Sequence, residues 1–273
     1  MSVLAGGNGT PTTGTYSNVS GTHWTVELMP SFFPETKIAK GEVGEYETDL
    51  LAIGVFAEAF EVKKGEDDTE TVVCISKALL AKDDSLNGAI SDIVAKGDFK
   101  GESGQSAVVR AGGKVKNVGL FGLGKRAEAK LPADWGRSVY YKMGGGVGNS
   151  AKGQKCESVA VEFDSAPEPG IADVTTHLIH GMLLEPYEAT RYKEKAKKNP
   201  LKSILLMNFD AVAESGVTKG YAFAKGASLT RYLVESPPNV CYPQHLADAA
   251  KMIADTFPDT ISLKVSQRSQ TER

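Results

Sequence analysis

The stretch Leu50-Leu-Ala-Ile-Gly-Val-Phe56 is a short and nearly continuous apolar run. Such a run is typical of a strand that is buried on both faces, as strands are in a parallel sheet covered by helices. Thr71-Val-Val-Cys-Ile75 is a second run of the same kind. The acidic, glycine-containing stretch Lys63–Glu70 between them predicts a solvated turn. The two runs therefore favour a sheet with a buried centre.

Strand and helix patterns alternate along the chain that follows. Leu86, Ile90, Ile93 and Val94 stand at helical spacing, which predicts an amphipathic helix that ends near Gly97. Strands are predicted at Ser106–Arg110, Asn117–Phe121, Cys156–Phe163 and Ser203–Phe209, and helices from near Pro132 into Gly144–Gly146 and over Ile171–Leu184. Strands interleaved with helices indicate an α/β layer structure with a central sheet.

The composition excludes several classes of protein. The chain has 273 residues, 41% hydrophobic and 24% charged, which is an ordinary globular balance. Its net charge of −3 gives no reason to expect nucleic acid or an anionic membrane as a partner. No apolar run approaches the ~18 residues that a membrane span requires. Cys74, Cys156 and Cys241 show no CxxC spacing, so we expect free buried thiols rather than a disulfide or zinc site.

The first residues differ in composition from the rest of the chain. Residues 2–22 are rich in Ser, Thr and Gly and contain neither acidic residues nor Lys or Arg. A secretory signal would need a basic region followed by an apolar region. We therefore expect residues 1–24 to form a disordered leader.

The last third of the chain predicts two helices separated by prolines. Apolar residues at helical spacing before Leu233 give one helix, which Pro237 and Pro238 end because they lack an N–H donor. Pro243 suits the first turn of the next helix, whose apolar stripe includes Leu246 and Ile253. After it, Ile261, Leu263 and Val265 alternate as in a strand, and residues 266–273 form a polar tail.

Several segments resemble the leucyl (cytosol) aminopeptidase family. The junction between the two helices, Leu233-Val-Glu-Ser-Pro-Pro-Asn239 with Tyr242-Pro-Gln-His-Leu-Ala247, is similar to that family's junction between domains. Upstream, the same order of matches includes Gly97–Gly101, Val118–Lys125 and Gly181–Tyr187, so the resemblance spans roughly residues 45 to 265. One departure is Tyr242, which stands where the family has a small hydroxyl residue as helix cap.

The resemblance implies a fold and a parent activity. The implied fold is a macrodomain-like three-layer α/β/α domain at residues 25–212, followed at 213–265 by a linker helix and the start of a second, catalytic α/β domain. The implied reaction is the release of N-terminal amino acids from peptides by two divalent metals, Mn or Zn. The family also implies a homo-oligomer, a hexamer, in the cytoplasm or, alternatively, in a plastid.

The family's metal-binding motifs do not occur in these 273 residues. The family carries a Gly-Lys-Gly stretch with an Asp and an Asn-Thr-Asp-Ala-Glu-Gly-Arg stretch, and neither string is present. No catalytic, metal-binding or cofactor-binding residue can therefore be assigned, and we expect a chain that is truncated before the metal site and inactive alone. The alternative is a non-catalytic, macrodomain-like binding module or hexamer-assembly module.

Four other patterns could carry chemistry. His177 and His180 are three residues apart on a predicted helix, which suits either a metal pair or a partly exposed helix face. Gly119–Lys125 resembles a phosphate loop, but Arg126 replaces the hydroxyl residue, and a strand that turns through glycines is the other interpretation. Gly144–Ser150 suggests a flexible helix terminus or a phosphate loop. Arg191–Lys198 predicts a solvated basic loop or a polybasic contact.

Overall fold

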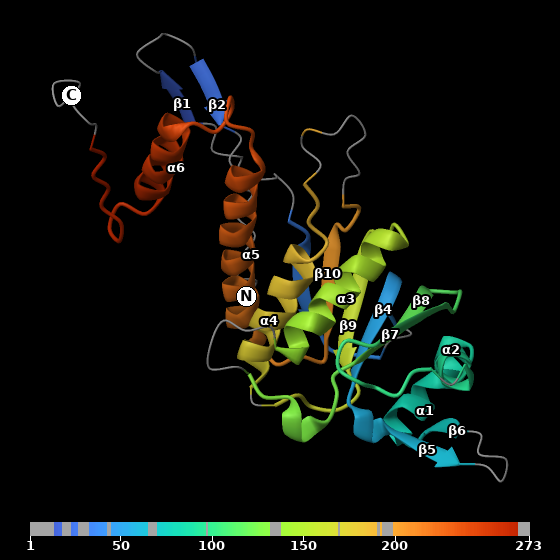
Figure 1. Cartoon of the computed structure of the whole chain (residues 1–273). Helices are drawn as coiled ribbons and strands as arrows, with labels where there is room; N and C mark the ends of the chain where they lie inside the picture. Colours follow the sequence, from blue (N-terminus) through green and yellow to red (C-terminus); the bar gives the residue numbers. More distant parts are fainter. Residues whose placement is uncertain are drawn as a thin grey trace. The chain divides into compact units, whose positions relative to one another are not determined.

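The computed structural model describes most of the chain (Figure 1). The described residues are 14–17, 23–26, 33–42, 45–64, 70–96, 98–131, 138–168, 170–189, 192 and 199–266. By their internal contacts, residues 33–225 form one compact unit, and residues 1–32 with 226–273 form a second. The two units are described separately.

A six-stranded sheet forms the centre of the larger unit. Its strand order is β3-β10-β9-β4-β8-β7, and all neighbouring strands are parallel except β7, which is antiparallel to β8. The strands are β3 (Glu35–Ala39), β4 (Thr48–Val55), β7 (Ser106–Arg110), β8 (Val115–Gly122), β9 (Ser158–Phe163) and β10 (Ser203–Met207). The α/β fold class predicted from the sequence is thus confirmed.

Helices cover both faces of this sheet, and β4 contributes to both cores. Leu50 and Ala52 point to the face covered by α3 (Val139–Gly153), α4 (Ile171–Leu184) and the first part of α5 (Ala213–Glu235). Leu51, Ile53 and Val55 point to the face covered by α1 (Lys77–Asp83) and α2 (Ala89–Ala95). Alternation across a strand buried on both sides explains the continuous apolar run.

The second apolar run does not belong to this sheet. It forms β6 (Glu70–Cys74), which pairs antiparallel with β5 (Phe60–Lys64) in a separate two-stranded sheet. Val72 and Cys74 are buried on one face, whereas Ile75 is 50% exposed. The expectation of a strand buried on both faces is therefore wrong for residues 71–75. A run of five apolar residues cannot by itself distinguish a central strand from an edge strand.

The glycine-rich segment at residues 144–148 lies inside α3. The predicted helix that runs into Gly144–Gly146 is present, but it continues to Gly153, so the interpretation of Gly144–Ser150 as a flexible helix terminus or a phosphate loop is wrong. Gly144 and Gly148 are buried at the contact with α4. A Cβ atom at Gly144 would lie 2.1 Å from the Leu178 carbonyl oxygen, and one at Gly148 would lie 2.4 Å from the Met182 carbonyl oxygen. The glycines therefore allow two helix backbones to approach closely, and this packing outweighs their low helix propensity.

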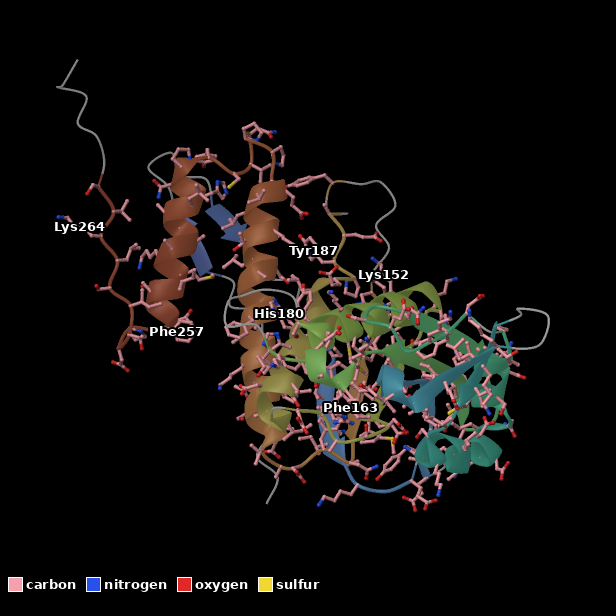
Figure 2. All side chains as sticks on the ribbon, turned by 60° about the horizontal axis from the view of Figure 1, so that its bottom comes forward. Lys152, Phe163, His180, Tyr187, Phe257 and Lys264 are labelled. Atoms are coloured by element: carbon pink, nitrogen blue, oxygen red, sulfur yellow. The ribbon has the colours of Figure 1, made fainter. Side chains whose placement is uncertain are left out.

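The α4 helix has the same kind of contact on its other side. In α5, a Cβ atom at Gly216 would lie 2.1 Å from the Ala172 carbonyl oxygen, and one at Gly220 would lie 2.8 Å from the Ile179 Cβ. At the end of α3, Lys152 donates to the Pro186 carbonyl at 2.7 Å, and Figure 2 shows it beside the segment that follows α4.

The second unit contains a hairpin and a helix. β1 (Gly14–Ser17) and β2 (His23–Val26) pair antiparallel. The other residues of the predicted leader, 1–13 and 18–22, lie outside the described residues. The predicted helix after Tyr242 is α6 (Pro243–Thr256). Residues 261–265 form no strand, and Ile261, Leu263 and Val265 are 39%, 42% and 54% exposed.

Candidate functional site

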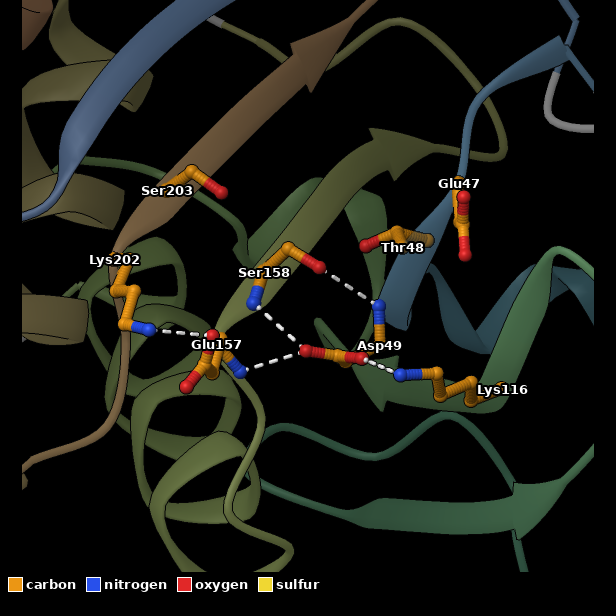
Figure 3. Close-up of a pocket in the computed structure, with 8 residues that line it drawn as sticks. All are labelled: Glu47, Thr48, Asp49, Lys116, Glu157, Ser158, Lys202 and Ser203. Carbon is orange, nitrogen blue, oxygen red and sulfur yellow. Dashed lines mark hydrogen bonds and ion pairs between the residues drawn. The ribbon is translucent and has the colours of Figure 1, made fainter.

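A charged cluster lies where the central parallel strands begin (Figure 3). It borders a depression of about 300 Å³ that is lined by Glu47, Thr48, Asp49, Lys116, Glu157, Ser158, Lys202 and Ser203. Asp49, near the start of β4, accepts hydrogen bonds from the Glu157 N–H at 2.7 Å, the Ser158 N–H at 3.1 Å and Lys116 Nζ at 2.6 Å. The Ser158 hydroxyl in turn accepts from the Asp49 N–H at 2.9 Å.

These contacts keep Asp49 ionised. Burial opposes ionisation, but the hydrogen bond from Lys116, the two backbone N–H donors and the charge of Lys116 together hold the pKa of Asp49 below its ordinary value. Because its carboxylate is committed to β8 and β9, the cluster fixes the relative positions of three strands. It therefore has the chemistry of a structural clamp, and no motif in the sequence indicates it.

The carboxyl ends of the strands, opposite the ends at which Asp49 lies, are where parallel α/β folds usually bind ligands. Such sites form beyond the carboxyl ends of adjacent strands whose connections leave toward opposite faces. β4 and β8 meet this condition, because the chain continues from β4 to α1 and α2 and from β8 to α3. This is also the place of the Gly119–Lys125 motif.

Gly101 of the chain itself lies across these ends, since a Cβ atom there would be 3.0 Å from the Ala57 Cα, and Gln105 continues the pairing of β7 with β8. The Gly124 N–H donates to the Gly101 carbonyl at 2.9 Å, and the Gly122 N–H donates to the Gln105 carbonyl at 2.8 Å. A Cβ atom at Gly122 would lie 2.1 Å from the Glu102 carbonyl oxygen, so the glycine is needed for this close approach. The interpretation of a strand end that turns through glycines is confirmed, since β8 ends at Gly122 and Gly124 has a φ of 76°.

Arg126, just beyond this edge, also makes contacts within the domain. Its guanidinium carbon lies 4.2 Å from the centre of the Phe56 ring, and its two terminal nitrogens donate to the Ala166 carbonyl at 2.8 Å and to the Ser165 hydroxyl at 2.5 Å. Arg126 thus links the loops that follow β4, β8 and β9 rather than meeting a phosphate.

The histidine pair on α4 packs against aromatic rings. His180 lies edge-on to Tyr141 at 5.0 Å between ring centres and 5.8 Å from the ring of Phe223. Burial lowers the pKa of His177, while the charge of Asp173 partly opposes this shift. Within the part of the chain that the structure describes, no group of three His, Cys, Asp or Glu side chains gathers in a way that could hold a metal ion.

Two further sequence patterns have simple outcomes. Cys74, Cys156 and Cys241 are free; the first two are buried as expected, whereas Cys241 is half-buried. Burial raises the pKa of both buried thiols. The basic stretch 191–198 lies outside the described residues except for Tyr192, and so does the predicted helix start at residues 132–137.

The comparison with protein families identifies the lineage of the domain. The profile of the N-terminal domain of the cytosol aminopeptidase family (M17) matches residues 53–196. This chain belongs to that family. The match covers β8, β9, α3 and α4 in full but only the end of β4. It therefore includes Lys116, Glu157 and Ser158 of the charged cluster but not Asp49 itself.

Curated relatives and a solved structure agree with the assignment to the M17 family. The chain is 31% identical over 235 residues to leucine aminopeptidase 3, chloroplastic, from Arabidopsis thaliana, covering 84% of this chain and 38% of that protein. It is 33% identical over 231 residues to leucine aminopeptidase 2, chloroplastic, from Oryza sativa subsp. japonica, covering 82% and 36%.

The structural match is to a mutant of tomato leucine aminopeptidase, with a TM-score of 0.69 and 27% identity. It covers 84% of this chain and 44% of that one. The M17-family chain thus spans well under half the length of the relatives that it matches. Within its described residues, no helix combines the length and the apolar character that crossing a membrane requires.

Proposed function

We propose that this chain supplies the N-terminal region of a leucyl-aminopeptidase-type enzyme. Residues 25–212 would be the N-terminal domain, and residues 213–265 the linker helix and the start of the catalytic domain. The observation that carries the proposal is the match of residues 53–196 to the family's N-terminal domain. The proposal also includes homo-oligomers, with a hexamer as the expected state, and a location in the cytoplasm or a plastid, two relatives being named chloroplastic.

The whole enzyme would release N-terminal amino acids from peptides with the help of two divalent metals, Mn or Zn. Neither of the family's metal-binding motifs occurs in the sequence of this chain. We therefore place the metals in the region of the relatives that this chain does not match, and we assign the 273-residue chain no peptidase activity of its own. Its contribution is a rigid domain whose strand starts are clamped by Asp49 and whose ligand edge is occupied by its own residues.

An assay of the purified chain tests this proposal. The chain would be incubated with leucine p-nitroanilide and Mn²⁺, beside tomato leucine aminopeptidase as the active reference. We expect release of p-nitroaniline by the reference and none that follows the chain through gel filtration. Turnover that co-elutes with the folded chain contradicts the assignment of inactivity.

A second measurement tests the link to a complete enzyme. The transcript would be sequenced beyond the codon for Val265. An in-frame Gly-Lys-Gly motif would place the residues of this chain within a full-length aminopeptidase. A transcript with no such motif in any product would contradict the proposed role as an enzyme's N-terminal region.

A further inference from the structure

Helix α5 changes its surroundings near its middle. The first part of the helix buries a stripe of small residues at helical spacing, namely Ala213, Gly216, Gly220 and Ala224. Among residues 226–235, all of which the structure describes, only Ser228 is buried. The boundary between the two compact units also falls between Lys225 and Gly226. Tertiary packing supplies most of the stability of protein helices, and this support therefore weakens after Lys225.

Gly226 differs from the other glycines of α5 in having no packing role. A Cβ atom at Gly216 would lie 2.1 Å from the Ala172 carbonyl oxygen, and one at Gly220 would lie 2.8 Å from the Ile179 Cβ. A Cβ atom at Gly226 would meet nothing within 4 Å. Alanine would therefore fit at position 226, and a helix interior favours alanine over glycine by roughly fivefold. The glycine makes this point of α5 easier to open than its neighbours.

The residues that follow Gly226 weaken the same turn of the helix. Ser228 and Thr230 are poorer helix formers than alanine, because their hydroxyls compete for backbone hydrogen bonds. The Thr230 hydroxyl donates to the Gly226 carbonyl at 3.0 Å. A hydroxyl in this position shares the carbonyl with the N–H of the helix ladder, and such sharing often bends a helix. The turn at 226–230 thus combines a glycine, a competing hydroxyl and little burial.

We propose that α5 opens and bends reversibly at Gly226, so that this residue is a hinge within the helix. The buried stripe that ends at Ala224 stays intact during the opening, because it lies wholly before the hinge. The free energy of opening is then set by one largely exposed turn rather than by the core. Glycine also reaches backbone conformations that other residues rarely adopt, which suits a hinge. The hinge does not depend on the peptidase role proposed above.

Amide hydrogen exchange, followed residue by residue by NMR, tests the hinge. We expect the amides of residues 227–230 to exchange at least about tenfold faster than those of residues 217–224, through a local opening that low concentrations of urea do not accelerate. The amides of residues 231–234 should again be better protected. Fraying of the helix end would instead give protection that falls steadily toward Glu235. Such a steady fall, or equal protection on both sides of Gly226, overturns the proposal.

Two alanine substitutions in α5 separate the hinge from the packing of the helix. Gly226→Ala should slow the exchange of the amides at 227–230 by about fivefold and should not lower the Tm. The matched control is Gly220→Ala, whose Cβ atom would lie 2.8 Å from the Ile179 Cβ. This variant should lower the Tm and leave the protection minimum at 227–230 in place. If Gly226→Ala leaves the exchange unchanged, the glycine does not open the helix and the proposal fails.

Distances between two spin labels test whether the opened helix also bends. The labels would be attached in Lys219→Cys and Val234→Cys, two exposed positions of α5 that a straight helix places about 22 Å apart along its axis. A Cys241→Ser background leaves only the buried Cys74 and Cys156 besides the labelled thiols. We expect a broad distribution of distances with Gly226 and a narrow one with Gly226→Ala. A narrow distribution in both proteins shows a rigid helix and overturns the proposal.

Discussion

The contact between α3 and α4 can be tested by adding one methyl group. Gly144→Ala would place a Cβ atom 2.1 Å from the Leu178 carbonyl oxygen and 2.9 Å from the Met182 nitrogen. Both are backbone atoms of α4, so no side-chain rotation can relieve the clash. The contact is reciprocal, because a Cβ at Gly181 of α4 would lie 2.1 Å from the Tyr141 carbonyl oxygen of α3. The helices would have to move apart.

The size of the effect follows from two opposing contributions. Alanine is favoured over glycine inside a helix by about 1 kcal/mol. Overpacking of a well-packed core costs about 1–3 kcal/mol, and the rigid backbone of α4 places this contact at the upper end. We therefore expect Gly144→Ala to lower the free energy of unfolding by about 2 kcal/mol. For a unit of this size, that corresponds to a fall in Tm of roughly 4–8 °C.

The control is the same substitution at the end of the same helix. A Cβ atom at Gly153 would meet nothing within 4 Å, so Gly153→Ala should leave stability unchanged or raise it by up to about 1 kcal/mol. Urea unfolding followed by circular dichroism would measure both variants. If Gly144→Ala proves as stable as the wild type, the close approach of the two helices does not limit stability, and the reasoning fails.

Two charged contacts lead to further predictions. Asp49→Asn should lower the free energy of unfolding at pH 7 by about 1.5–3 kcal/mol, as for the loss of hydrogen bonds to a charged group. Because the pKa of Asp49 is lower in the folded state, the stability that Asp49 contributes is present above its unfolded pKa of about 3.9. In an acid titration this contribution should vanish as the pH falls through the folded pKa. Lys82→Met removes the 2.8 Å partner of Glu162, whose side chain is 3% exposed, and should cost up to about 3 kcal/mol in thermal unfolding. Adding Glu162→Gln should recover much of that loss, and a double variant no more stable than Lys82→Met would contradict a buried-charge penalty.

Sequence reasoning predicted the elements whose pattern depends on local spacing. The predicted ranges of β7 and α4 coincide with the observed ones, and β4 begins two residues before the predicted run and ends one residue before its end. In each, apolar periodicity reports which side faces a core. The run Thr71–Ile75 was predicted as a strand correctly, but its sheet was not, because a pattern within one strand does not identify its neighbour.

Features that depend on distant segments were not predicted. Helix α3 contains Gly144, Gly145, Gly146 and Gly148, which indicate a loop until α4 is known to lie against them. The role of Asp49 could not be predicted from the local sequence, because its hydrogen-bond donors lie far along the chain. Lys116 is 67 positions away, and the backbone donor of Glu157 is 108 positions away. A polar residue immediately before a buried apolar run could have suggested an anchoring role, but it could not have identified Lys116 as its partner.

The residues that lie across the ends of β4 and β8 make contacts there that a bound small molecule makes in other α/β domains. A protein that binds a small molecule in the native state alone gains stability that rises with the logarithm of ligand concentration. Here Gly101 and Gln105 supply the contacts at that position from within the chain. The local concentration of this internal partner is fixed by covalent connection, so these two contacts do not depend on the concentration of any dissolved molecule.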